Sequence, residues 1–400
     1  MKALKNEVLW SLVFLMILEV FVSEKIFFVI SLIFFLSIIY KQKFKLYIPK
    51  IPGLKAYCIM CVVAFVVGLT LYTPRNVARD TFYFLPTITW IFIGYNLKKF
   101  HNPKIDIFKI IFLYGSFISI YSIIMYLLNF SLDFQSLRTT FGIKIYEVGF
   151  ILPIMVFLVF VYKNVYFGKK IDRFLIVIMF LQVALSFGRI SILQPIIVFL
   201  ALMLYEWLFG NKKKIAFKYT ILSVVFILIF GIIVYNLLPS EILKMFSDKI
   251  VNSFTEVDSS ISIVNTSEAM NNWRAYEIQA EKSQWLSSNI LIKIFGDGFG
   301  FGTYCQFIPY SWDWLSGNRI ALLHNGYYTC LEKLGVVGLI ALISMFAGTI
   351  FNGIKNKRKI TSNILVAICV GAIANTFVVR GPIQQGTFLV WALLLGWCTF

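Results

Sequence analysis

Charged residues are scarce in this chain. They make up 14% of its 400 residues, whereas hydrophobic residues make up 59% and the mean hydropathy is +0.82. Soluble globular domains carry about 25% charged and about 45–50% apolar residues. A water-facing surface of ordinary polarity cannot be built from this composition, so we expect lipid to be the outer solvent. The predicted fold class is an all-α polytopic membrane protein.

Acidic residues are few compared with basic ones. Nineteen Asp and Glu stand against 37 Lys and Arg, which gives a net charge of +18. In a soluble protein this excess would suggest nucleic acid. In a membrane protein it first indicates which loops face the cytoplasm. We therefore predict no nucleic-acid partner.

Histidine and cysteine are too sparse for a metal or redox centre. The two histidines, His101 and His324, fall on opposite sides of the predicted membrane, and no His/Cys/Asp cluster has ligand spacing. Cys58 and Cys61 lie inside an apolar run, which does not suit a redox pair, and Cys305 has no cysteine partner within its loop. We predict no metal and no cofactor.

Long apolar windows are abundant. No small-residue cleavage site follows the first of them, so we expect no cleaved signal peptide. Twelve windows predict spanning helices. They are 8–22, 26–40, 55–72, 81–97, 105–129, 146–162, 171–187, 190–209, 215–238, 320–351, 361–378 and 384–400. The predicted organisation is nine spans in 1–238, one large extracytoplasmic loop with short helices in 239–319, and three spans in 320–400.

The short loops alternate between lysine-rich and lysine-poor. The basic positions are Lys2, Lys5, Lys41, Lys43, Lys45, Lys50, Lys98, Lys99, Lys104, Lys163, Lys169, Lys170, Lys212, Lys213, Lys214, Lys355, Lys357, Arg358 and Lys359. Every second loop is basic, as positive-inside topology requires. This alternation predicts that both termini are cytoplasmic and that the large loop lies outside.

Arginine is distributed differently from lysine. Arginines on the predicted outer side are Arg75, Arg79, Arg138, Arg189, Arg274, Arg319 and Arg380. The planar, permanently charged guanidinium is a preferred partner of phosphate and carboxylate groups. Any one of them is as well explained by pairing with an outer Asp or Glu. Together they favour an anionic ligand at the outer surface.

Two predicted outer positions suit chemistry. His324 lies at the outer start of a long span, where histidine can serve as a general base; the alternative is a hydrogen bond to an outer loop. Arg189 lies at a tight turn between two spans, where we expect Gly188 to supply the permitted backbone. There Arg189 could present its guanidinium to a lipid-bound ligand, or it could reach the outer headgroups.

The large loop contains two further patterns. Asn265 followed by Glu268 predicts a helix start, and the helix, with Trp273, Arg274 and Tyr276, ends near Ser288. The run Gly296, Gly298, Gly300, Gly302 resembles a dinucleotide fingerprint only superficially, because no βαβ unit surrounds it. We favour a turn that re-enters the membrane. The alternative is a set of backbone amides exposed to phosphate.

Four short motifs between about 180 and 345 resemble, in order and spacing, the O-antigen ligase and polymerase family of bacterial envelope glycosyltransferases. They are Ser186-Phe187-Gly188-Arg189-Ile190-Ser191, Trp273-Arg274-Ala275-Tyr276, Phe295-Gly296-Asp297-Gly298-Phe299-Gly300, and His324-Asn325-Gly326-Tyr327 with Glu332, Gly335, Val336, Val337, Gly338 and Leu339. The first half of the chain agrees only as hydrophobic spans. Gly188 departs from the Ser or Thr that is common there, which puts a second ligand at the turn in doubt.

The resemblance implies transfer of a glycan from an undecaprenyl pyrophosphate-linked donor at the outer leaflet, without metal and with inversion. It implies that Arg189 and Arg274 bind the pyrophosphate, that His324 is the base, and that Arg319, Arg138 and Arg380 are further binding candidates. Tyr327 is a candidate for stacking on sugars, although packing at the membrane interface explains it equally. It also implies the bacterial inner membrane, with the active site on the periplasmic face, and a chain-length regulator and a flippase as partners.

Three functions remain open. The favoured one is a polymerase that extends a lipid-linked repeat of O-antigen or capsule, on the His-Asn-Gly-Tyr and Phe-Gly-Asp-Gly-Phe-Gly segments. The second is an O-antigen ligase that transfers the glycan to lipid A core. The third is a lipid-linked oligosaccharide flippase; the absence of an internal repeat and the position of the ionisable residues at the outer rim argue against it.

Overall fold

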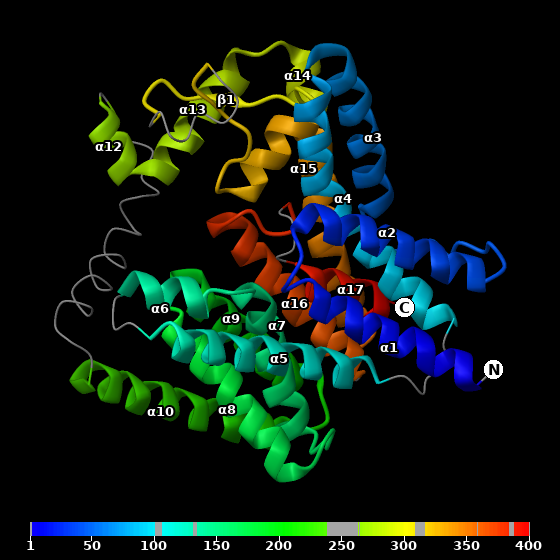
Figure 1. Ribbon diagram of the computed structural model, residues 1–400, viewed down its shortest axis with the longest axis vertical. Coiled ribbons are helices and arrows are strands. Elements are labelled where there is room, and N and C mark those ends of the chain that lie inside the picture. The colour runs from blue at the N-terminus through cyan, green and yellow to red at the C-terminus, as the bar shows by residue number, and fades with distance from the viewer. Residues whose placement is uncertain are drawn as a thin grey trace.

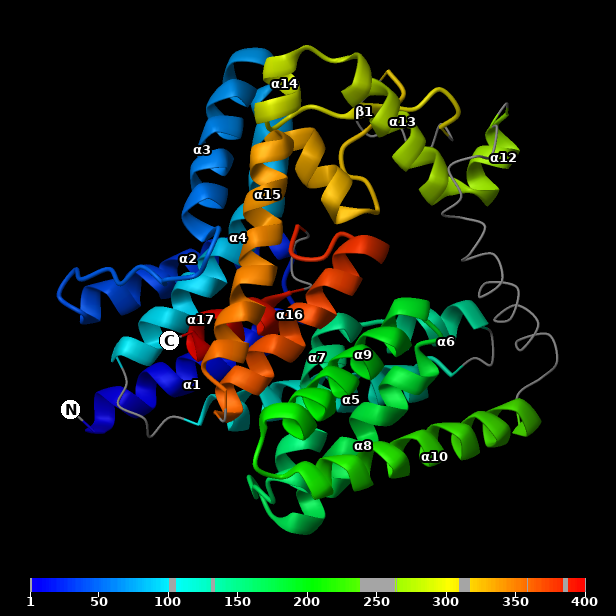
Figure 2. The same cartoon turned by 180° about the vertical axis from the view of Figure 1, so that it is seen from behind.

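The computed structural model describes residues 2–100, 106–130, 134–237, 263, 265–308, 317–357, 359–383 and 388–399. These residues form helices and one short two-stranded sheet (Figures 1 and 2). The elements are α1 (Lys2–Leu18), α2 (Glu24–Lys41), α3 (Leu54–Leu71), α4 (Pro74–Phe100), α5 (Ile107–Leu128), α6 (Phe134–Phe141), α7 (Ile145–Val156), η1 (Phe157–Val161), α8 (Lys169–Leu185), α9 (Arg189–Phe209), α10 (Lys213–Leu237), α12 (Thr266–Asn271), α13 (Trp273–Ser287), α14 (Ile290–Phe295), β1 (Thr303–Tyr304), β2 (Arg319–Ile320), α15 (Gly326–Lys355), α16 (Ile360–Val378) and α17 (Leu389–Cys398).

Each predicted apolar window overlaps a helix. Within the described residues, α3, α5, α9, α15 and α16 are long and apolar enough to cross a membrane. The segments Gln135–Phe141 and Ile145–Val161, bent by 63° at the break between them, would together make a sixth. The chain is therefore an all-α protein of membrane type. The count of twelve spans and the large outer loop stay predictions.

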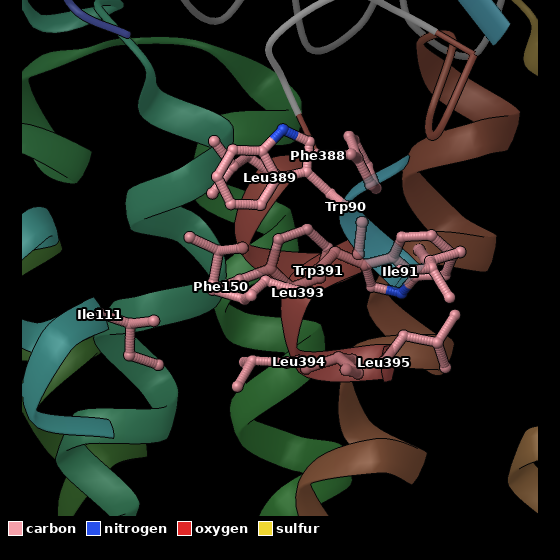
Figure 3. Close-up of a cluster of buried hydrophobic side chains, with 14 of the residues drawn as sticks. Trp90, Ile91, Ile111, Phe150, Phe388, Leu389, Trp391, Leu393, Leu394 and Leu395 are labelled. Atoms are coloured by element: carbon pink, nitrogen blue, oxygen red, sulfur yellow. The ribbon is translucent and has the colours of Figure 1, made fainter. Parts of the chain in front are cut away.

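The last predicted window, 384–400, holds a short and fully enclosed helix. At ten residues α17 is about 15 Å long, roughly half the thickness of a bilayer core. Figure 3 shows Trp391 and its neighbours packed against Trp90 and Ile91 of α4 and Phe150 of α7. The Glu147 carboxylate accepts the first amides of the helix, Leu389 N (2.7 Å) and Val390 N (2.8 Å). These bonds satisfy two of the amides that a helix N-terminus leaves without intrahelical partners, so α17 is held as a core element.

Helix α15 is broken where Gly335 adopts φ 64° and ψ −170°. The break frees backbone carbonyls that a continuous helix would use. Asp297 N donates to Glu332 O (2.9 Å) and Gly298 N donates to Lys333 O (3.2 Å), so the Gly-rich run supplies the missing donors. Such a break is tolerated at membrane depth only where protein satisfies the backbone.

The Gly-rich run also enters the side of α3. Phe299 N donates to Ala64 O (2.9 Å), and Gly300 N donates to the Asp80 carboxylate (2.7 Å). A Cβ on Gly298 would lie 3.0 Å from Ala64 O, so the close approach requires glycine. The run therefore turns onto the flank of an apolar helix, and its re-entry into the membrane stays a prediction. The phosphate alternative is wrong for residues 297–300, because all four of their amides are used by protein acceptors.

The predicted outer helix is two helices. Asn265 caps α12 by accepting Glu268 N (2.9 Å), as the pattern indicated, but α12 ends at Asn271 and α13 begins at Trp273. The end of α13 at Ser287 is also as predicted. At the other end of the loop, Arg319–Ile320 form β2 and pair with Thr303–Tyr304, so α15 begins at Gly326 and not at 320. Residues 239–262, 264 and 309–316 of the predicted loop lie outside the described residues.

Candidate functional site

The segment that carries His324 is fastened to the end of α16. The Asn325 side chain caps α15 by accepting the amides of Tyr327 (3.0 Å) and Tyr328 (3.2 Å), and its amide donates to Phe377 O (3.0 Å). Gly326 N donates to Val379 O (3.0 Å), and a Cβ there would lie 2.4 Å from Arg380 O. The Asn325 side chain therefore uses both its oxygen and its amide group in hydrogen bonds, and these bonds fix the backbone next to His324.

The His324 imidazole is held by Glu277 of α13. Nδ1 lies 3.0 Å from both carboxylate oxygens of Glu277, and the His324 main-chain N–H donates to Oε2 (2.8 Å). A carboxylate only accepts, so Nδ1 carries the hydrogen and Nε2 keeps the lone pair. The imidazole side chain is 38% exposed, whereas the Glu277 side chain is 2% exposed. Nε2 is thus the basic atom that a substrate can reach.

Glu277 is itself held by a neighbour on α13. Trp273 Nε1 donates to Oε1 (2.7 Å) one helical turn away. With the two contacts from His324, the buried carboxylate has partners on both oxygens, as a buried charge requires. A histidine oriented by a fixed carboxylate is the arrangement that makes imidazole a general base in many unrelated enzymes.

Three of the predicted binding arginines, Arg274, Arg138 and Arg380, are close enough to Tyr146 at the start of α7 to act on its hydroxyl electrostatically. They come from α13, α6 and the turn after α16, which are far apart in the sequence. The fold therefore brings three cationic side chains into the surroundings of one tyrosine.

Arg380 links this region to the histidine segment directly. Its Nε donates to Leu323 O (3.1 Å) and its Nη2 to Leu322 O (3.5 Å). Burial lowers the pKa of Arg380, and the nearby Glu277 carboxylate raises it. The guanidinium stays charged because its ordinary pKa lies far above neutrality. Arg380 therefore positions the His324 backbone in addition to contributing charge.

Arg189 lies at a turn as short as predicted. Helix α8 ends at Leu185 and α9 begins at Arg189, whose side chain is half-buried. The assignment of the turn backbone to Gly188 was wrong: Gly188 has φ −85°, and the left-handed residue is Phe187, with φ 45°. Glycine is needed at 188 for space, since a Cβ would lie 2.4 Å from Ser191 Oγ. The role of Arg189 at the site stays a prediction.

Arg319 and Tyr327 are used elsewhere. Arg319 Nη1 donates to Gly302 O (2.7 Å), and its guanidinium lies 5.4 Å from the Phe301 ring centre, beside the Gly-rich run. The Tyr327 hydroxyl donates to Ile373 O (3.1 Å) on α16. These contacts fit packing roles. A cavity of about 250 Å³, lined by Lys50, Asn352 and Asn356 among others, lies near the far end of α15 and includes none of the predicted site residues.

A buried ionic cluster adjoins the site. We define it as Asp80, Glu281, Thr303, Glu332 and Lys333. Lys333 Nζ lies 3.0 Å from Asp80 Oδ2 and 3.6 Å from Glu332 Oε1, and Thr303 Oγ1 lies 2.7 Å from Glu281 Oε2 and 3.1 Å from Glu332 Oε1. A hydroxyl donates one hydrogen. One of the two carboxyl groups must therefore carry a proton for both contacts to be favourable.

Glu281 gives this cluster a pH dependence. Burial raises the pKa of Glu281 to about 7 from an ordinary 4.5. The folded state thus keeps the proton where the unfolded chain has lost it, and stability falls as pH rises from about 4.5 to about 7. We expect the fall in Tm of purified protein between pH 5 and pH 8 to be smaller in Glu281→Gln, by roughly 2–4 °C. An equal fall in both proteins would contradict this assignment.

Comparison with known proteins adds no assignment: no family model matches the chain, and no curated protein matches it. Among the described residues, no group of three His, Cys, Asp or Glu side chains is arranged to hold a metal ion. The chemistry proposed for the site therefore depends on the side chains of His324, Glu277 and the arginines.

Two residues of the candidate site, Glu277 and Tyr146, were not predicted from the sequence. The sequence does contain a pattern that indicates Glu277. It lies three residues after Arg274 and four after Trp273, and side chains at these spacings are neighbours on a helix. Tyr146 has no comparable signal, since its importance comes from which arginines the fold brings to it.

Proposed function

We propose that the protein is an envelope glycosyltransferase that transfers a glycan from a polyprenyl pyrophosphate-linked donor to a hydroxyl group. The single observation that carries this proposal is the His324–Glu277 pair beside the arginines around Tyr146. It supports a general base at Nε2 with arginines in its surroundings. The motif order described above is in keeping with the O-antigen ligase and polymerase family.

The arginines suit the leaving group. A pyrophosphate gains charge as the glycosidic bond breaks, and fixed guanidinium groups stabilise that charge without reorganisation. Arg274 and Arg380 are the candidates for this role, because Arg274 lies three residues before Glu277 on α13 and Arg380 contacts the His324 segment. Arg138 and Arg189 are proposed to bind the donor farther from the reacting carbon.

The reaction is a direct displacement. The acceptor oxygen attacks the anomeric carbon of the donor while its proton passes to His324 Nε2. The bond from that carbon to the pyrophosphate oxygen breaks, and the polyprenyl pyrophosphate leaves with the electron pair. A pyrophosphate leaves without protonation, so one base suffices where glycosidases use two carboxylates. One displacement inverts the anomeric centre.

We favour a polymerase over a ligase, as the His-Asn-Gly-Tyr and Gly-rich segments suggested. The acceptor would then be a second lipid-linked repeat unit. A chain-length regulator and a flippase of the same pathway are the proposed partners. The proposed location is the bacterial inner membrane, with both termini in the cytoplasm and the site on the periplasmic face.

One feature favours the transporter alternative. The break of α15 at Gly335 beside buried Asp80, Glu332 and Lys333 is of the kind found in transporters, where interrupted helices carry ionisable groups. In this chain, however, the freed carbonyls are taken by the Gly-rich run and Lys333 is paired with Asp80, so the break is filled by protein.

The glycan ladder of a deletion strain distinguishes the three functions. A polymerase predicts loss of long chains with one repeat still attached to the core. A ligase predicts loss of all attached chains and accumulation of lipid-linked polymer. A flippase predicts lipid-linked single repeats trapped inside the cell. The second or third pattern, reversed by the wild-type gene, would replace our proposal by the corresponding alternative.

A further inference from the structure

An apolar surface covers the elbow between α13 and α14. We define the apolar elbow as Leu286, Ile290, Leu291 and Phe295. Ile290 is 67% exposed and Leu291 is 64% exposed, although both are large aliphatic residues. Contiguous exposed apolar side chains indicate an interaction surface and are costly in water.

The contacts of α14 set the position of the apolar elbow along the axis of α3. Helix α14 packs on α15 and touches α3, and Figures 1 and 2 show it beside the end of α3 that leads into α4. Directly after α14 the chain enters the flank of α3, where Phe299 N donates to Ala64 O. Ala64 lies seven residues before the end of α3 at Leu71, which is about 10 Å along a helix. The elbow is thus level with the outer end of an apolar helix.

The apolar elbow continues the exposed face of α3. Val66, Leu69 and Leu71 on the outer half of α3 are exposed large hydrophobic residues, as expected of a lipid-facing surface. Helix α14 is in contact with α3, so the two sets of exposed side chains lie on neighbouring helices. The surface that faces lipid on α3 therefore extends onto the outer loop.

The charges near the elbow have one sign. Residues 282–295 contain Lys282 and Lys293 and no acidic residue. Lys282 is exposed, and Lys293 Nζ lies 5.8 Å from the ring centre of Trp285. Tryptophan and lysine at the edge of an apolar surface are typical of the headgroup level of a bilayer. The pattern is that of a segment that lies in the membrane interface.

We propose that the apolar elbow is inserted into the outer leaflet of the membrane, with Lys282 and Lys293 at the level of the lipid phosphates. The lipid acyl chains are the occupant of the exposed surface. The insertion holds α13, and with it Arg274 and Glu277, at a constant height above the acyl chains. This inference is independent of the proposed function.

The test is a depth measurement in vesicles. Single cysteines at Ile290 and Leu291, and at the exposed Ser283 of α13 as a matched control, are spin-labelled in a background in which Cys58, the one half-buried native cysteine, is Ser. The full chain is reconstituted in vesicles of phosphatidylethanolamine and phosphatidylglycerol. Electron paramagnetic resonance then measures collisions with oxygen, which concentrates in lipid, and with a water-soluble nickel complex.

We expect the ratio of oxygen to nickel collisions at 290 and 291 to exceed that at 283 several-fold. Equal, water-like ratios at all three positions would overturn the proposal. Water-like ratios that become protected only when a second protein is added would assign the surface to a protein partner and would overturn it equally. Gel filtration and circular dichroism of the labelled variants, matching the unlabelled protein, show that folding is not the cause of a difference.

Discussion

His324→Ala is expected to abolish long glycan chains in a complemented deletion strain while one repeat remains attached to the core. The variant removes the only imidazole at the site, and Nε2 is the atom placed to take the acceptor proton. Loss of a general base costs about 10²–10⁴-fold in rate. The readout is the ladder on a denaturing gel, normalised to the amount of protein in the membrane fraction.

The matched control is His101→Ala, the other histidine of the chain. His101 lies outside the described residues and in a predicted cytoplasmic loop, so its removal is expected to leave the ladder unchanged. Full-length chains with His324→Ala would remove the base assignment. Loss of chains with both variants would point to a general defect and away from this site.

Glu277→Gln is expected to lower polymerisation on the order of 10³-fold, with the protein still folded. Glutamine keeps the size of the side chain and can accept from Trp273 Nε1, but its amide can donate to Nδ1. The imidazole can then carry its hydrogen on Nε2, which is the tautomer that cannot act as a base. Initial rates with purified protein and a lipid-linked repeat measure the loss.

Two variants separate positioning from folding. Glu277→Asp retains a carboxylate and is expected to recover part of the rate, which a purely structural defect would not do. Glu281→Gln makes the same change one turn further along α13, in the buried ionic cluster and away from His324, and is expected to keep the rate. Equal rates for Glu277→Gln and Glu277→Asp would contradict an orienting role for the carboxylate.

Local patterns predicted the helices well. The window 55–72 corresponds to α3 at Leu54–Leu71, and Asn265 with Glu268 marked the start of α12. Such features depend on neighbours in the chain: a run of apolar side chains, or a cap three residues from its amide. The turn before Arg189 was also recognised, although the strained backbone falls on Phe187 and not on Gly188.

Contacts between distant segments could not be predicted from one sequence. Glu277 and His324 are 47 residues apart, and nothing local says that α13 turns its carboxylate toward the start of α15. Arg319 is close to His324 in the chain, yet its side chain is directed to Gly302 and Phe301. The break at Gly335 likewise follows from the docking of the Gly-rich run, which no apolar window reports.

The bond from Gly300 N to the Asp80 carboxylate has a consequence for biogenesis. It joins residues 220 positions apart, and Lys333, which pairs with Asp80 in addition to the neighbouring Arg79, is made later still. Until α15 has been inserted, Asp80 lacks this cation. The helices that are made first therefore lie in the membrane before Asp80 has its contacts with Gly300 and Lys333. The Gly-rich run and α15 complete the contacts of Asp80 only late in synthesis, so a chain released before α15 is made is expected to be less stable than the full chain.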